Sequence, residues 1–183
     1  MSLTPDYIVG LTDGEGSFGI SITKSADNNV GFEVYPHFRI ALHEKDAGLL
    51  EEVRVFFSFG NVVRRSQEGL RGRGVRASDL ALFEVNSLAG CNRIREFFQK
   101  NELRSSKRRD FELWSRCIEL VISKRHLKTS GFLEIAKLRD QINVTGKMRA
   151  VGKSQYRDYE WFKRKLIGNS NIEAGVIQKE ELV

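Results

Sequence analysis

Two carboxylates near the N-terminus have the spacing of possible metal ligands. Asp13 and Glu15 lie two residues apart, with Gly14 between them. Thr4 can cap a helix and Pro5 suits its first position, so we predict a helix that begins near residue 5 and ends at these acids.

The end of that helix is unfavourable for negative charge unless a cation binds there. Exposed carbonyls give a helix C-terminus a partial negative charge, which disfavours both carboxylates. Mg²⁺ binds one or two carboxylates and keeps positions open for water and phosphate oxygens. We therefore predict metal ligands at Glu15, the Gly14 carbonyl and, as a weaker candidate, Asp13. The alternative is a glycine-capped helix end with two solvated acids.

Gly10 and Gly14 share one face of the same helix, four residues apart. A glycine inside a helix costs about 1 kcal/mol relative to alanine, so the pair needs a compensating contact. Positions without side chains allow a second helix to approach closely. We predict that this face, with Tyr7, pairs with the same helix of a second copy.

These residues form a recognisable signature. The run Ile8-Val9-Gly10-Leu11-Thr12-Asp13-Gly14-Glu15-Gly16 resembles that of the LAGLIDADG homing endonucleases. The resemblance extends over about residues 5–125, through His43-Glu44-Lys45-Asp46, the turn Phe59-Gly60-Asn61-Val62 and the stretch from Leu103 to Trp114.

The resemblance implies a fold and an activity. The fold is a mixed α/β (α+β) one, an αββαββα core with a four-stranded antiparallel, saddle-like sheet. The activity is Mg²⁺-dependent hydrolysis of both strands of a long, roughly palindromic double-stranded DNA target, leaving short 3′ overhangs. Mn²⁺ or Ca²⁺ are other ions for the same sites. The chain has one signature, and single-signature members act as homodimers. Alternatives are an RNA maturase that assists splicing of its own intron, or a DNA-binding protein of this fold that does not cleave.

The resemblance also suggests roles for one acidic residue, Glu15, and for two others, Lys107 and His43. Glu15 would be catalytic. A lysine in the basic run Leu103–Asp110 would lie near the scissile phosphate. Lys107 is our candidate for this lysine, and Arg108 is the residue that could take its place. A solvated, basic helix start explains this run nearly as well. Family members often carry a glutamine where this chain has Leu42. That glutamine helps to position the attacking water, and His43 is a candidate for the same role here. The alternative is that His43 caps the following helix.

Two alternating segments predict strands with a polar outer face. Phe18, Ile20 and Ile22 alternate with polar residues in 17–24, and Phe32, Val34, Phe38 and Ile40 do so in the next strand. Pro36 predicts an edge or a bulge there. The outer face fits a ribbon in the DNA major groove, although a solvated face has the same pattern. The predicted DNA-binding residues of these strands are Ser21, Thr23, Lys24, Glu33, Tyr35, His37 and Arg39.

An arginine-rich connection follows, from Arg64 to Arg76. We predict a mobile loop whose guanidinium groups bind phosphates or guanines, the alternative being a solvated hairpin. The candidates are Arg64, Arg65, Arg71, Arg73 and Arg76, with Arg108 from the later basic run.

The remaining periodicity predicts helices and two further strands. The helices are expected at Glu44–Phe57, Ala89–Lys100, Phe111–Ser123, Phe132–Ile142 and Tyr156–Ile167, and the strands at 62–66 and 78–86, with Ala81, Phe83 and Val85 inward. We divide the chain into an endonuclease core, 1–125, and a helical extension, 126–183, that packs on it. The extension carries basic residues for phosphate contact: Arg149, Lys153, Arg157, Lys163, Arg164 and Lys165.

Bulk composition agrees with a nucleic-acid partner. The 183 residues carry a net charge of +6, which suits a polyanion without requiring one. Cys91 and Cys117 lack metal-site spacing, so we expect buried thiols in a reducing compartment. The first residues do not resemble a signal peptide, and no segment is apolar enough to span a membrane. We therefore expect an intracellular protein, located with the genome that carries the intron.

Overall fold

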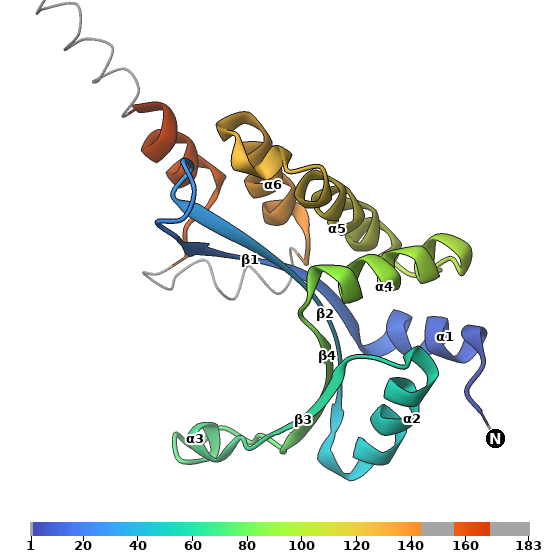
Figure 1. Ribbon diagram of the computed structural model, residues 1–183. Helices are drawn as coiled ribbons and strands as arrows, with labels where there is room; N and C mark the ends of the chain where they lie inside the picture. Colours follow the sequence, from blue (N-terminus) through green and yellow to red (C-terminus); the bar gives the residue numbers. More distant parts are fainter. Residues whose placement is uncertain (1, 144–155, 169–183) are drawn as a thin grey trace, which may run out of the picture.

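A curved, four-stranded antiparallel sheet forms the centre of the structure, with helices packed on one face (Figure 1). The computed structural model describes residues 2–143 and 156–168. Its elements are α1 (Pro5–Glu15), β1 (Gly16–Lys24), β2 (Phe32–His43), η1 (Glu44–Asp46), α2 (Ala47–Phe57), β3 (Asn61–Arg65), α3 (Glu68–Arg71), β4 (Leu80–Val85), α4 (Leu88–Lys100), α5 (Lys107–Ile122), η2 (Arg125–Leu127) and α6 (Thr129–Gln141). A further helix spans 159–168. This is the mixed α/β fold that the sequence predicts.

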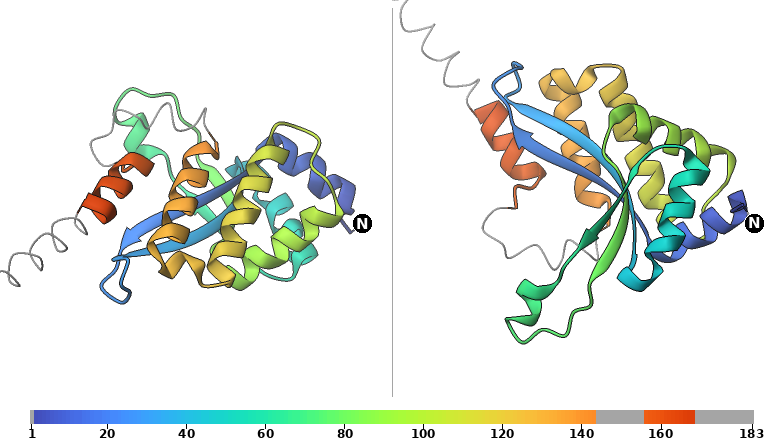
Figure 2. Two further views of the ribbon diagram at one scale, coloured as in Figure 1. Left: turned by 90° about the horizontal axis from the view of Figure 1, so that it is seen from above. Right: turned by 60° about the horizontal axis from the view of Figure 1, so that its bottom comes forward.

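The alternating residues of the strands separate a core from an outward face. The strand order is β1-β2-β4-β3, and every residue predicted to point inward is buried except Ile22, which is partly buried. The opposite side, which we call the outward face, lies away from α1, α2, α4 and α5 (Figure 2). By strand register it carries Ser17, Gly19, Ser21, Thr23, Glu33, Tyr35, His37, Arg39, Asn61, Val63, Arg65, Leu82 and Glu84.

Pro36 lies where β2 is locally an edge strand. It pairs with Ile20 of β1, whereas β4 pairs with β2 only from Phe38 to His43. A missing N–H on the unpaired side costs no ladder hydrogen bond, and this explains how proline is tolerated in a long strand.

Helix α1 begins and ends as its sequence predicts. The Thr4 hydroxyl accepts a hydrogen bond from the Tyr7 amide at 3.3 Å, and Pro5 is the first helical residue. At the other end Gly16 donates its amide to the Thr12 carbonyl. A Cβ at Gly16 would lie 2.7 Å from that carbonyl oxygen, so this position requires glycine.

Several element boundaries differ from prediction, and one short helix is additional. Ser58, in the left-handed conformation with φ 60°, ends α2 in place of Gly60. The arginine-rich connection contains a short helix, α3, within the β3–β4 hairpin. Helix α5 begins at Lys107 rather than Phe111. The prediction starts too late because the first turn of the helix is basic and lacks the apolar periodicity of the rest.

The described part of the C-terminal extension packs on the helical layer. Helix α6 lies against α5, and Phe162 of the last helix is 1% exposed. The Phe162 ring contacts those of Phe32 and Phe132. Arg149 and Lys153 lie outside the described residues.

Two further expectations can be compared with the described residues. Both cysteines are buried, and burial raises the pKa of the Cys91 thiol to about 12. Within the ranges 2–143 and 156–168, no helix has the length and apolar character needed to cross a bilayer.

Candidate active site

The C-terminal end of α1 presents an exposed carboxylate beside an exposed backbone segment. Glu15 and Gly14 are both solvent-exposed. No group of three or more His, Cys, Asp or Glu side chains that could hold a metal exists in the described part of the chain. An all-protein cage is therefore not formed by the described residues of one subunit. One carboxylate and one carbonyl instead fit an ion such as Mg²⁺, which completes its shell with water and phosphate oxygens.

Lys107 lies at the same helix end. Its ammonium group donates hydrogen bonds to the Gly14 carbonyl at 3.2 Å and to the Gly16 carbonyl at 2.5 Å. A cation is stabilised there by the partial negative charge of the helix terminus. The structure thus brings the predicted catalytic lysine and two of the predicted metal ligands, Gly14 and Glu15, to one place.

Asp13 is held by the segment that precedes α5. Its carboxylate accepts hydrogen bonds from the Arg104 amide at 2.9 Å, the Ser105 amide at 3.1 Å and the Ser105 hydroxyl at 2.7 Å. Partial burial disfavours its charge, but these bonds and nearby Lys107 outweigh that effect and lower the pKa of Asp13. These contacts support the alternative role of orienting the helix end. Ser105, which we had not singled out, completes this connection.

Asp13 should make the stability of the fold depend on pH in acid. Because its pKa lies below the ordinary 3.8, it stabilises the native state above that pH, and this contribution is lost as pH falls through the lower native pKa. We expect Asp13→Asn to lower the free energy of unfolding by about 1 kcal/mol at pH 7, because it turns an amide group toward two backbone N–H groups.

Urea unfolding at pH 7, 4 and 3 measures this effect. The difference between wild type and Asp13→Asn should shrink below about pH 4. Asp46→Asn is the control, since Asp46 makes no side-chain capping bond to α2. A difference that stays constant from pH 7 to 3 would contradict the role given to Asp13.

The contacts of His43 and Arg108 are local. The Nδ1 atom of His43 accepts a hydrogen bond from the Lys45 amide at 3.2 Å, which is the capping alternative considered above. Arg108 forms ion pairs with Glu102 at 3.3 Å and Glu112 at 3.2 Å. Of the two predicted catalytic candidates, Lys107 rather than Arg108 therefore contacts the end of α1.

Most of the predicted DNA-binding strand residues share the outward face. Tyr35 is 44% exposed and donates a hydrogen bond to Glu33, which raises the pKa of Tyr35. Burial, with the positive charge of Arg39, lowers the pKa of His37. Its ring occupies the space that a Cβ at Gly19 would need. Lys24 alternates with these residues along β1, so it does not belong to the outward face, and it is exposed at the end of the strand.

The arginines of the β3–β4 hairpin have acidic partners that sequence analysis missed. Arg65 pairs with Glu84 at 2.6 Å, and Arg71 pairs with Asp79 at 2.7 Å. Arg64 lies 3.6 Å from Glu44 and opposite Ala81, which faces the helices. Its strand parity therefore places it on the other side of the sheet from Arg65. The two remaining candidates, Arg73 and Arg76, are exposed.

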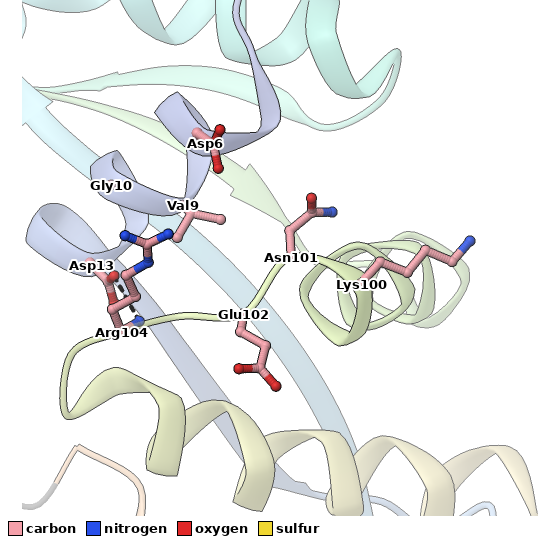
Figure 3. A pocket seen from close by; sticks show the side chains of 8 residues that line it. All are labelled: Asp6, Val9, Gly10, Asp13, Lys100, Asn101, Glu102 and Arg104. Carbon is pink, nitrogen blue, oxygen red and sulfur yellow. Dashed lines mark hydrogen bonds between the residues drawn. The ribbon is translucent and has the colours of Figure 1, made fainter.

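The glycine face of α1 is open. Tyr7 is 46% exposed, and, apart from the backbone of α1 itself, no described atom lies within 4 Å of a Cβ built on Gly10 or Gly14. Among the described residues, no packing contact at these Cβ positions therefore offsets the cost of the two glycines. Figure 3 shows a polar hollow beside this face, between α1 and the segment after α4. It is lined by Asp6, Val9, Gly10, Asp13, Lys100, Asn101, Glu102 and Arg104.

Curated relatives of the chain are fungal proteins. It is 26% identical over 167 residues, 89% of this chain, to the probable intron-encoded endonuclease 3 of Neurospora crassa. It is 32% identical over 128 residues, 69% of this chain, to an uncharacterized 50.9 kDa protein in ND4 intron 1 of Podospora anserina. The chain spans 28% and 26% of the lengths of these two proteins.

Solved structures also match most of the chain. The homing endonuclease I-TnaI superposes with a TM-score of 0.71 at 26% identity, over 92% of this chain and 99% of that chain. I-SmaMI bound to uncleaved DNA target in the presence of calcium ions gives 0.67 at 28% identity, over 78% of this chain and 45% of that chain. The family model for LAGLIDADG endonucleases matches residues 8–118. This chain belongs to the LAGLIDADG endonuclease family.

Proposed function

We propose that this chain is a homodimeric, Mg²⁺-dependent endonuclease that cuts both strands of a long, roughly palindromic DNA target and leaves short 3′ overhangs. The observation that carries the proposal is the placement of exposed Glu15 at the end of α1, beside the Gly14 carbonyl and the Lys107 ammonium group. This end adjoins the open glycine face, so pairing of two α1 helices brings two such sites together.

The dimer follows from the need to cover that face. Pairing through Gly10 and Gly14 allows close approach of two backbones. Two copies also agree in size with I-SmaMI, since the chain aligns with 45% of that chain. A two-fold symmetric protein selects a target whose halves are related by the same symmetry.

Each site hydrolyses one strand. Glu15 and the Gly14 carbonyl would hold the metal, and Mg²⁺ bound there would supply an activated water and charge stabilisation for the leaving oxygen. Lys107 contributes a fixed positive charge where negative charge accumulates on the phosphate. Asp13 keeps Lys107 in place by binding Arg104 and Ser105 in the segment before α5.

The outward face supplies the DNA-binding surface. Strand β2 has 12 residues, and at about 3.3 Å per residue it extends about 40 Å, close to one turn of B-DNA. Two subunits therefore cover about 20 base pairs. Contacts of this length make a target rare within a genome.

Linearisation of a plasmid tests the activity. The plasmid carries the junction left when the intron is absent from the host gene, and a matched plasmid carries the same junction interrupted. We expect linear product from the first plasmid in Mg²⁺ and none after chelation with EDTA. Tight binding to the intron RNA without any nicking of DNA would reject the proposal and select the maturase function.

A further inference from the structure

Glu84 is a buried carboxylate on the outward face of the sheet. It is 7% exposed. It belongs to a row of paired residues that crosses all four strands: Ser17 of β1 lies opposite Arg39 of β2, Arg39 lies opposite Glu84 of β4, and Glu84 lies opposite Asn61 of β3. A negative side chain in the middle of a surface proposed to bind DNA opposes phosphate affinity. Its presence there therefore needs a separate explanation.

Two arginines from different strands converge on this carboxylate. Arg39 Nε of β2 and Arg65 Nη2 of β3 lie 2.9 Å and 2.6 Å from the same oxygen, Glu84 Oε1. The Arg39 N–H is not directed at that oxygen, so this contact is an ion pair rather than a hydrogen bond. Arg65 lies four residues after Asn61 on β3, whereas Glu84 lies opposite Asn61. The Arg65 side chain must therefore extend back along the sheet, past Leu82, to reach Glu84.

Because Glu84 is buried, its contacts with Arg39 and Arg65 orient the two guanidinium groups. A buried carboxylate is stable only when its charge is compensated, so Glu84 holds both guanidinium groups close. The Arg39 and Arg65 side chains nevertheless remain 33% and 48% exposed. Each guanidinium group carries five donors, and those outside the ion pair with Glu84 are available to a ligand from the exposed part of each side chain. A guanidinium edge fixed in this way matches the two acceptors of guanine in the major groove.

We propose that Glu84 is a specificity-determining residue: it orients Arg39 and Arg65 to select a guanine each in every half-site. This inference rests on the proposed DNA-cutting function. Phosphate contacts give affinity without sequence information, whereas base contacts specify. Glu84 lowers the attraction for phosphates and directs the two arginines to bases.

The test is selection of bound DNA from a randomised duplex library by the full-length protein in Ca²⁺, with base preference measured at each position. Wild type should prefer guanine about 5- to 150-fold at two positions per half-site, the range of one bidentate contact. Glu84→Gln should lose both preferences, keep the others and bind random duplex more tightly. Arg39→Lys, which keeps the charge but loses the planar fork, should lose one preference only.

Glu134→Gln is the matched control. Glu134 of α6 also bridges two arginines, Arg116 at 2.9 Å and Arg125 at 3.3 Å, but it lies in the helical layer. It should leave every base preference unchanged. Unaltered guanine preferences in both Glu84→Gln and Arg39→Lys would overturn the inference while leaving the proposed function intact. A wild-type protein that selects no sequence at all would reject both.

Discussion

Replacement of Glu15 by glutamine should abolish DNA cleavage without abolishing DNA binding. The variant keeps the size and exposure of the side chain but removes the negative charge that binds the metal. Metal-ion catalysis contributes several kcal/mol, so we expect the cleavage rate to fall by at least about 10³-fold. The measurement is the single-turnover rate of plasmid linearisation in Mg²⁺, together with the Kd for the same target in Ca²⁺.

The control for this variant is Glu52→Gln. Glu52 is an exposed carboxylate on α2, remote in sequence from the signature, and its loss should leave both rate and affinity unchanged. Undiminished cutting by Glu15→Gln would remove Glu15 from the catalytic site. A loss of cutting accompanied by an equal loss of binding would assign it to DNA affinity instead.

Replacement of Gly10 by leucine should stabilise the isolated subunit and yet inactivate the enzyme. A Cβ at this position meets no described atom within 4 Å outside the backbone of α1, and removing a glycine from a helix interior gains roughly 1 kcal/mol. The same side chain prevents the close approach of two α1 helices. We expect a monomer by sedimentation equilibrium at concentrations where wild type is a dimer, and no plasmid linearisation.

Gly48→Leu provides the comparison. Gly48 is a second exposed helical glycine, in α2, with no atom within 4 Å of its Cβ position. This variant should remain dimeric and active. If Gly10→Leu also forms a wild-type dimer, α1 is not the subunit interface. If wild type is itself monomeric at every concentration tested, the dimer proposal fails without reference to any variant.

Elements with local signals could be predicted from the sequence. Thr4 and Pro5 define the start of α1 through contacts within one turn, and alternation defines β1 and β2 because one face of each strand is buried. The signature itself marks Glu15 and Gly14 as predicted metal ligands. These features depend on residues close in the chain, so a single sequence contains them.

Features that depend on register or on distant segments could not be predicted. Asp13 binds residues 91 and 92 positions away, and Glu84 meets Arg39 and Arg65 only because β4 lies between β2 and β3. The pattern of β4 marks Glu84 as outward but does not show that it is buried. Ser58 ends α2 in a left-handed conformation although the nearby Gly60 is the residue type that favours it.

A mixed dimer tests the central claim most directly. One wild-type subunit and one Glu15→Gln subunit, carrying different affinity tags and purified through both, are given a supercoiled plasmid with one target. If each Glu15 serves one strand of a shared duplex, the product is a nicked circle, whereas the wild-type dimer gives linear DNA. Linear product from the mixed dimer, or no cutting of either strand, would contradict two paired sites that each cut one strand.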